Sequence, residues 1–323
     1  MGLRFDYFDS DGKVLADPAD PEIYDPAKKE HRYKNYDPAL PENEWGPEYT
    51  IEEREKFWYK KAKAKSQLSP RFGISFPITN QGVIHFSYGW FFQNPELRYL
   101  YENPKFWVDV KKANVTPRIG NADIGPERTV MYEVGLQQGV WDRVFLHVTG
   151  FYRDIRDWVG ISAPIDTYWG TTYHKYINYD HAAVKGITFN TRFMMSQFSV
   201  NIDYTYMIAK GTYSNPQEAY TQIREQKEPR VQLINLNWDQ RHTINTTIGY
   251  SKNGWSGSMI ASLNSGFPYT PSFYRGESVG GTTLSELKVN SEFRPTTFTI
   301  DLRISKRIRL MGVNYDIMIN VYN

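Results

Sequence analysis

The chain has 323 residues, of which 16% are aromatic, yet its mean hydropathy of −0.59 is that of a polar protein. Its formal charge of +2 is too small to indicate a nucleic-acid partner, and the absence of cysteine excludes disulfides, thiolate metal sites and a cysteine nucleophile. The 24 Tyr and 9 Trp favour places where an apolar ring meets water at one end, which is typical of a membrane–water interface.

No stretch approaches the roughly 18 consecutive apolar residues of a membrane-spanning helix, so membrane residence is expected to be by β-barrel. Residues 1–7 lack the basic region and apolar run of a signal peptide, and they already alternate like a strand. We therefore expect the chain to begin inside a domain.

After a first strand over residues 2–8 comes a stretch rich in Pro, Asp, Glu and Tyr, residues 10–70, which we expect to be a large extracellular loop. Within it Thr50, followed three residues later by Glu53, matches a capping box. This motif predicts a short loop helix from about residue 50 to 65.

From Arg71 onward very short connections alternate with long polar ones. The short ones are residues 80–82, 140–142, 196–197, 252–254 and 311–313, and the long ones lie near 9–70, 94–128, 162–181, 211–240 and 266–294. Bacterial outer-membrane barrels have short periplasmic turns and long extracellular loops, whereas a sandwich or propeller mixes loop lengths at both ends.

The runs between these connections alternate with a period of two. In residues 198–208 one face carries Phe198, Val200, Ile202, Tyr204, Tyr206 and Ile208, and the other carries Ser199, Asn201, Asp203 and Thr205. One soluble, half-buried strand would show the same pattern, but it recurs in 130–137, 298–305 and 315–321. The sequence therefore predicts an all-β fold, a partial antiparallel transmembrane barrel of about eleven strands.

Large aromatic side chains near the strand ends predict interfacial girdles, with ordinary edge aromatics as the alternative. They are Trp90, Phe92, Trp141, Trp158 and Trp255.

Several segments resemble the barrel of TonB-dependent receptors in their order and spacing. Residues 70–79 and 85–95 resemble the family's mid-barrel hairpin, and residues 121–128 and 132–135 resemble its asparagine, proline-glutamate and tyrosine-glutamate-glycine stretch. Residues 184–187 resemble the family's lysine-glycine strand start. Residues 238–243 and 265–271 are similar to later strand and loop signatures, and residues 319–323 resemble the penultimate strand. The variant resembles most closely the receptors with a carboxypeptidase-regulatory-like N-terminal extension, which are common in Bacteroidetes-type bacteria.

The family barrel has about 22 strands, so the resemblance implies that residues 1–323 are the second half of a barrel. The family's plug domain, TonB box and final aromatic-ended strand are not visible in this sequence. The resemblance implies energised import of a large, scarce substrate such as a siderophore, cobalamin, oligosaccharide or peptide. The implied partners are outer-membrane lipid, the TonB complex acting through the plug, and a surface lipoprotein.

Two other functions are compatible with the alternation of the strands. A passive porin or adhesion barrel would have the same pattern without a plug upstream. A soluble all-β carbohydrate-binding module would show the same alternation, but it would not reside in a membrane.

No phosphate-binding loop or dinucleotide fingerprint is found, so we do not expect an enzyme. None of the six histidines pairs with another at metal-ligand spacing; His174 and His181 share one loop region, where solvated side chains are expected rather than a metal site.

The expected outer loops are rich in aromatic residues, which stack on sugar rings or flat chelates while polar groups fix the orientation. The alternative is that these rings pack loop against loop or join the outer girdle. The predicted substrate-binding residues are Trp58, Tyr59, Tyr99, Trp107, Tyr168, Trp169 and Tyr173.

Overall fold

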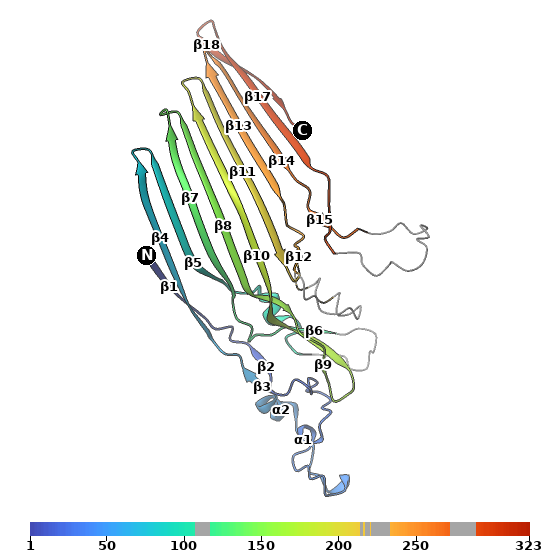
Figure 1. The fold of residues 1–323 in the computed structure, drawn as a ribbon. Coiled ribbons are helices and arrows are strands. Elements are labelled where there is room, and N and C mark those ends of the chain that lie inside the picture. The colour runs from blue at the N-terminus through green and yellow to red at the C-terminus, as the bar shows by residue number, and fades with distance from the viewer. Residues whose placement is uncertain (107–116, 214–215, 217–219, 221–232, 272–288) are drawn as a thin grey trace, which may run out of the picture.

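The computed structural model describes residues 1–106, 117–213, 216, 220, 233–271 and 289–323. Within these residues, eleven long strands form one antiparallel sheet in which each pairs with the next along the chain (Figure 1). They are β1 (Gly2–Phe8), β4 (Lys65–Thr79), β5 (Gly82–Gln93), β7 (Glu127–Val140), β8 (Val144–Ile161), β10 (Thr172–Met194), β11 (Phe198–Gly211), β13 (His242–Lys252), β14 (Trp255–Asn264), β17 (Thr297–Leu310) and β18 (Val313–Val321). The predicted antiparallel barrel wall of about eleven strands is confirmed.

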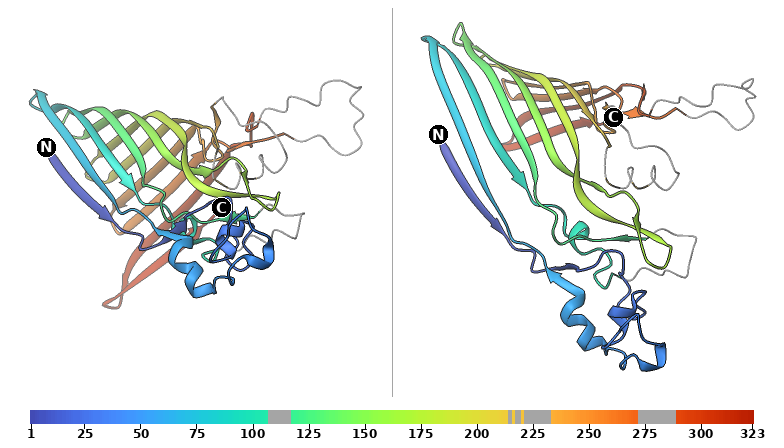
Figure 2. Two further views of the ribbon diagram at one scale, coloured as in Figure 1. Left: turned by 90° about the horizontal axis from the view of Figure 1, so that it is seen from below. Right: turned by 60° about the horizontal axis from the view of Figure 1, so that its bottom comes forward.

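The sheet curves across its width into an open trough, with β1 and β18 at its two edges (Figure 2). All short turns lie at one end of the strands and all long connections at the other (Figure 1). We call these the turn end and the loop end.

The five predicted short turns are confirmed. The β13–β14 turn consists of Asn253 and Gly254, which have φ values of 50° and 76°. Positive φ at both central residues is the geometry whose twist matches that of the flanking strands, and Asn-Gly is the pair that adopts it most readily. Met311 and Gly312 repeat this turn between β17 and β18, with φ values of 50° and 80°.

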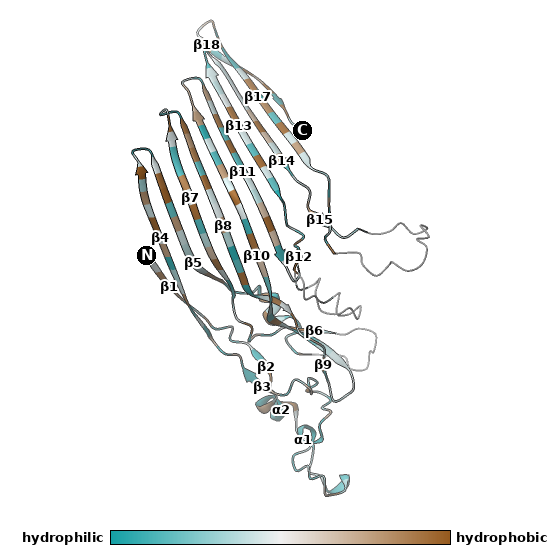
Figure 3. Ribbon diagram, in the orientation of Figure 1, coloured by the Kyte–Doolittle hydropathy of each residue, from teal (hydrophilic) through white to brown (hydrophobic). Residues whose placement is uncertain are grey.

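The register of the strands separates two faces of the sheet. Tyr204 of β11 lies opposite Phe189 of β10 and Ile244 of β13, so the apolar side chains form a continuous band across the wall. On the other face Thr205 lies opposite Thr188 and Thr243. Figure 3 shows the alternation along most strands. This is the predicted division into a lipid face and a wet, lumenal face.

The lumenal face is joined by polar contacts between strands. Asp203 accepts hydrogen bonds from Asn190 Nδ2 at 2.5 Å and from Asn201 Nδ2 at 2.6 Å, and Ser262 Oγ donates to Asn245 Oδ1 at 2.8 Å.

Among the described residues, no helix is both long enough and apolar enough to cross a membrane.

Of the predicted girdle residues, Trp141 and Trp255 lie at the turn end and are exposed, while Trp90 and Phe92 lie near the loop end of β5. Trp158 is different, because its side chain packs against a cluster of Ala182, Val184, Ala209 and Leu236. Val184 and Ala209 lie opposite each other on the lumenal face, so Trp158 belongs to this inner packing rather than to an outer belt.

Smaller elements fill the connections at the loop end. They are β2 (Lys13–Leu15), α1 (Lys29–Arg32), η1 (Glu42–Glu44), α2 (Ile51–Trp58), β3 (Tyr59–Lys61), α3 (Leu97–Tyr101), β6 (Arg118–Ile119), β9 (Ile165–Asp166), β12 (Ile234–Asn235), β15 (Pro268–Tyr269) and β16 (Glu292–Phe293).

The predicted capping box is present at the start of α2. Thr50 Oγ1 accepts from the Glu53 amide at 3.3 Å, and Glu53 Oε2 accepts from the Thr50 amide at 2.9 Å. The helix ends at Trp58 rather than near residue 65, because the next residues form β3 and pair with β2. A strand partner that is distant in sequence therefore shortens the helix.

The expected loop over residues 162–181 is also shorter than predicted. β10 already begins at Thr172, because β6 and β9 pair with its first residues and β8 continues beside it past irregularities in register at Asp180. This extended part of β10 carries three of the buried aromatic and imidazole side chains of the loop end, Tyr173, His174 and Tyr176.

Candidate functional site

Three long connections pack into one layer at the loop end. Leu15, Ile23, Trp58, Phe106, Ile119 and Tyr173 form a buried cluster, which we call the loop core. Tyr173 is fully buried, and its hydroxyl donates to the carbonyl oxygen of Pro18 at 2.7 Å. The connections that precede β4, β7 and β10 therefore hold one another in place before any ligand binds.

Three of the predicted substrate-binding aromatics are buried in this layer. Trp58 and Tyr173 belong to the loop core, and Tyr99 packs against Tyr176 with ring centroids 4.9 Å apart. Burial raises the pKa of Tyr99 and of Tyr173, which is the response of a phenol removed from water. In the structure these rings contact neighbouring loops, and whether they bind substrate stays a prediction.

Two predicted residues, Tyr168 and Trp169, are exposed at 54% and 40%. Trp169 Nε1 donates to the carbonyl oxygen of Asp25 at 3.2 Å, and Lys28 Nζ lies 4.9 Å from the centre of the Tyr168 ring. The loop that carries both rings is thus anchored while part of each ring remains open to a ligand.

Tyr59 lies between these cases. Its ring is 5.5 Å from that of Phe106, centroid to centroid, and burial raises its pKa to about 12. The remaining predicted residue, Trp107, lies outside the described residues.

A pocket of about 840 Å³ opens between α3, β6 and the extended part of β10. We call it the mouth pocket. It is lined by Leu97, Arg98, Tyr99, Tyr101, Glu102, Arg118, Tyr176 and Pro216.

The polar groups of the mouth pocket are paired with one another. Arg98 Nη2 donates to Tyr99 Oη at 2.6 Å, and its guanidinium lies 4.6 Å from the centre of that ring. Arg118 Nη2 lies 3.4 Å from Glu102 Oε1, and the Tyr176 hydroxyl donates to the same carboxylate. Arg98 Nε lies 2.9 Å from Glu96 Oε2, so each guanidinium faces one carboxylate. Such a site offers guanidinium donors beside aromatic rings, which suits a flat ring that carries hydrogen-bond acceptors.

Sequence reasoning found Tyr99 but not Arg98, Glu102 or Arg118. No short motif marks them, because the pocket unites residues from α3, β6 and β10 that are far apart along the chain. The only available signal was the dense run of aromatic and basic residues in Leu97–Tyr101.

His174 is buried near this site. Its Nδ1 lies 3.0 Å from the carbonyl oxygen of Ser162, and burial lowers the pKa of the imidazole. Among the described residues, no three His, Cys, Asp or Glu side chains gather in a way suited to a metal ion.

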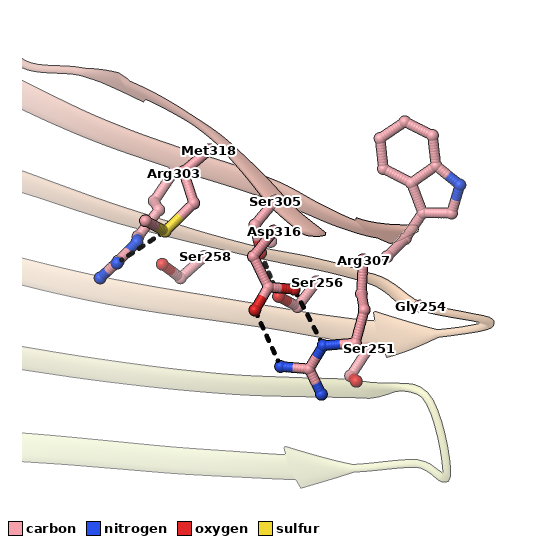
Figure 4. Close-up of a pocket in the computed structure, with 11 residues that line it drawn as sticks. Ser251, Gly254, Ser256, Ser258, Arg303, Ser305, Arg307, Asp316 and Met318 are labelled. Atoms are coloured by element: carbon pink, nitrogen blue, oxygen red, sulfur yellow. Dashed lines mark hydrogen bonds and ion pairs between the residues drawn. The ribbon is translucent and has the colours of Figure 1, made fainter. Parts of the chain in front are cut away.

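The lumenal face carries two polar grooves near the turn end. Figure 4 shows the groove of about 600 Å³ on β14, β17 and β18. Arg307 donates to both carboxylate oxygens of Asp316, at 2.8 and 3.1 Å, and Ser256 Oγ lies 2.6 Å from Ser305 Oγ. The second groove, of about 910 Å³, includes Asn190 and Asp203. The first groove presents mainly hydroxyl and charged groups, whereas the second also exposes Val83, Phe145, Leu146 and Met194 beside its amide and charged groups.

Comparison with known proteins gives one family over the whole length. The model described as TonB dependent receptor-like, beta-barrel matches residues 1–323. No curated protein sequence matches the chain.

Solved structures similar to the chain are outer-membrane proteins. The outer membrane transporter YddB from Escherichia coli is 15% identical, with 75% of this chain and 34% of that chain covered and a TM-score of 0.54. The siderophore receptor PirA from Acinetobacter baumannii is 16% identical, with coverage of 77% and 35% and a TM-score of 0.53. The siderophore receptor PiuA from the same species is 14% identical, with coverage of 81% and 32% and a TM-score of 0.51. At these identities the likeness shows the fold, and the chain spans about a third of each structure's length.

Proposed function

The chain belongs to the TonB-dependent receptor β-barrel family and lies in the cell outer membrane, and from that premise we propose that the complete receptor actively imports a large, scarce substrate. The observation that carries this proposal is the asymmetry of the wall. A packed loop layer with a pocket lined by aromatic rings and guanidinium groups lies at one end of a polar lumenal face. That arrangement suits capture from outside followed by passage along a wet path.

The loop layer is proposed to face the cell exterior, including the stretch over residues 10–70 predicted to be an extracellular loop. Long connections lie outside in bacterial barrels and short turns face the periplasm. The mouth pocket and the exposed rings of Tyr168 and Trp169 would then contact substrate, with Tyr59 at the edge of the layer. The buried rings of Trp58 and Tyr173 would support them, and Tyr99 would do both, since it packs against Tyr176 and lines the mouth pocket.

The energy for import is proposed to come from the TonB complex, acting through a plug domain inside the barrel. The two grooves on the lumenal face near the turn end, one hydroxyl-rich and charged and the other of mixed polar and apolar lining, suit contact with such a domain. A surface lipoprotein over the loop layer is a further proposed partner, for which the family resemblance is the support.

Among the substrate classes, the mouth pocket favours a molecule that carries flat rings and hydrogen-bond acceptors. Arg98 and Arg118 supply donors, each beside a carboxylate, and Tyr99 and Tyr176 supply ring surfaces next to them. A siderophore with aromatic chelating groups fits this description. The siderophore receptors PirA and PiuA share the fold of the wall.

Uptake by cells that express the whole receptor tests the proposal. Radiolabelled ferric siderophores, cobalamin, oligosaccharides and peptides would be supplied with and without an uncoupler of the proton-motive force. Active import predicts accumulation of one class that the uncoupler abolishes. Uptake that persists in the uncoupler would indicate a passive porin, and no uptake of any class would indicate an adhesion barrel.

Matched variants locate the binding surface. Arg98→Ala and Trp169→Ala are each expected to reduce cell-surface binding of the accumulated substrate by about tenfold, as loss of a central contact does. Trp141→Ala removes a large exposed ring at the turn end and serves as the control. If Trp141→Ala weakened binding as much as the loop-end variants, the mouth assignment would be wrong.

A further inference from the structure

Two histidines face each other on the lumenal side of the wall. His85 of β5 lies opposite Gly135 of β7, and Gly135 in turn lies opposite Thr149 of β8. His147, two residues before Thr149, projects to the same face. The imidazole rings of His85 and His147 have centroids 5.3 Å apart and planes inclined by 55°.

The His85 imidazole lies directly over Gly135. A Cβ atom at Gly135 would lie 2.2 Å from His85 Cε1, 2.5 Å from His85 Nε2 and 2.7 Å from Thr149 Oγ1. Thr149 Oγ1 is also 3.0 Å from His147 Nε2, so it links the two histidines. Glycine at position 135 leaves room for the His85 ring, which a larger residue would displace.

The separation of the rings fits a shared metal ion. A bond of about 2.0–2.1 Å from imidazole nitrogen to metal, plus about 1.1–1.2 Å from that nitrogen to the ring centre, places each centroid about 3.2 Å from the metal. Two such rings at a tetrahedral angle would be separated by about 5.2 Å. The observed centroid separation of 5.3 Å agrees with this value, and ligation through His147 Nε2 would require Thr149 Oγ1 to release that nitrogen.

We propose that His85 and His147 bind a divalent transition metal ion on the lumenal wall. Imidazole ligands favour Cu²⁺, Ni²⁺ and Zn²⁺ over Mg²⁺ and Ca²⁺, which prefer oxygen. The Thr149 hydroxyl accepts or donates a hydrogen bond to water on the metal. Two protein ligands leave coordination positions open, so the site suits an exchangeable ion rather than a closed structural centre.

Metal titration of the complete receptor in detergent tests this proposal, with Cu²⁺ as the probe. Calorimetry is expected to show a site that His85→Gln and His147→Gln each weaken by about tenfold or more. Electron paramagnetic resonance of bound Cu²⁺ is expected to show coupling to two imidazole nitrogens in the unmodified receptor and to one in each variant.

Two further variants separate metal binding from general effects. Gly135→Ala keeps both histidines but displaces the His85 ring, so it is expected to weaken Cu²⁺ binding as much as loss of one ligand. His242→Gln changes a histidine that lies beside Tyr204 on the lipid face and is expected to change nothing. Thermal melting of each variant shows whether the barrel is folded, and the glutamine variants suffice if Gly135→Ala is not.

The proposal is overturned if the unmodified receptor shows no nitrogen-coupled Cu²⁺ signal. It is equally overturned if that signal is unchanged in the double variant His85→Gln, His147→Gln. Neither result depends on transport. The metal-site proposal can therefore be wrong while the importer proposal is right, and the importer proposal can be wrong while the metal-site proposal is right.

Discussion

The strand wall and the loop layer bury their apolar side chains against different partners. On the lipid face of the wall, Phe76 and Val134 are 68% and 56% exposed within the chain itself. In the loop layer, Leu100 and Tyr173 are 2% and 0% exposed. The wall therefore needs a bilayer to cover it, whereas the loop layer carries its own core as a soluble domain does.

This difference predicts that a cavity in the loop core lowers the stability of the loop layer strongly and that of the strand wall only slightly. Trp58→Ala removes a large buried ring from the loop core and is expected to destabilise that layer by about 3–5 kcal/mol. Hydrogen exchange and limited proteolysis should show faster opening of residues 13–61, with strands β7 to β14 unchanged. If the strands opened equally, the two regions would be one cooperative unit.

The wall should respond to charge according to the face that receives it. Ile202→Arg places a guanidinium in the lipid band of β11 and is expected to destabilise the barrel in vesicles by about 2–4 kcal/mol. Thr205→Arg, three residues along the same strand on the lumenal face, is the control and should cost much less. Urea titration in lipid vesicles measures both, and equal losses would mean that the two faces meet the same environment.

The smallest expected effect lies where the two regions join. Asp123 accepts from the Lys63 amide at 2.9 Å and from Lys65 Nζ, at the start of β4, at 2.8 Å. Partial burial raises the pKa of Asp123, but the hydrogen bonds from Lys65 and Lys63 outweigh it and leave the pKa below its usual value of 3.8. A carboxyl group whose pKa is lowered by folding contributes its full stabilisation when the pH is above its pKa in the unfolded state. That contribution is lost as the pH falls through its pKa in the folded state.

The Lys63 amide should therefore show constant protection from hydrogen exchange, after correction for intrinsic rates, down to about pH 4 and less protection below it. The change is expected to stay under about tenfold, because the ion pair is partly exposed to solvent. Asp123→Asn should remove the pH step. A step that persisted in this variant would assign it to another group.

Much of the wall could be predicted because its determinants are local. The two-residue alternation in residues 198–208 and the Asn253-Gly254 turn each act over a few neighbouring residues. The Thr50–Glu53 capping box was likewise visible, although the end of its helix was not, since the pairing of β3 with β2 decides it.

The sites were harder to predict because their members come together only across the sheet and between loops. Tyr168 and Tyr173 are five residues apart with similar chemistry, yet one is exposed and the other fully buried. A high aromatic content indicates a loop that can bind ligands, but only the packing of the loops decides which ring faces outward. Arg98 and Arg118 meet in the mouth pocket through α3 and β6, which no local pattern connects.

By itself the sequence determined that the strands are amphipathic, where they turn, and that one face is apolar and the other polar. These properties follow from side-chain period and turn chemistry, which are encoded residue by residue. Only the tertiary structure decided which strand residues become neighbours. His85, Gly135 and His147 lie on three strands, and the antiparallel register alone brings the two imidazoles together, with the His85 ring over the glycine.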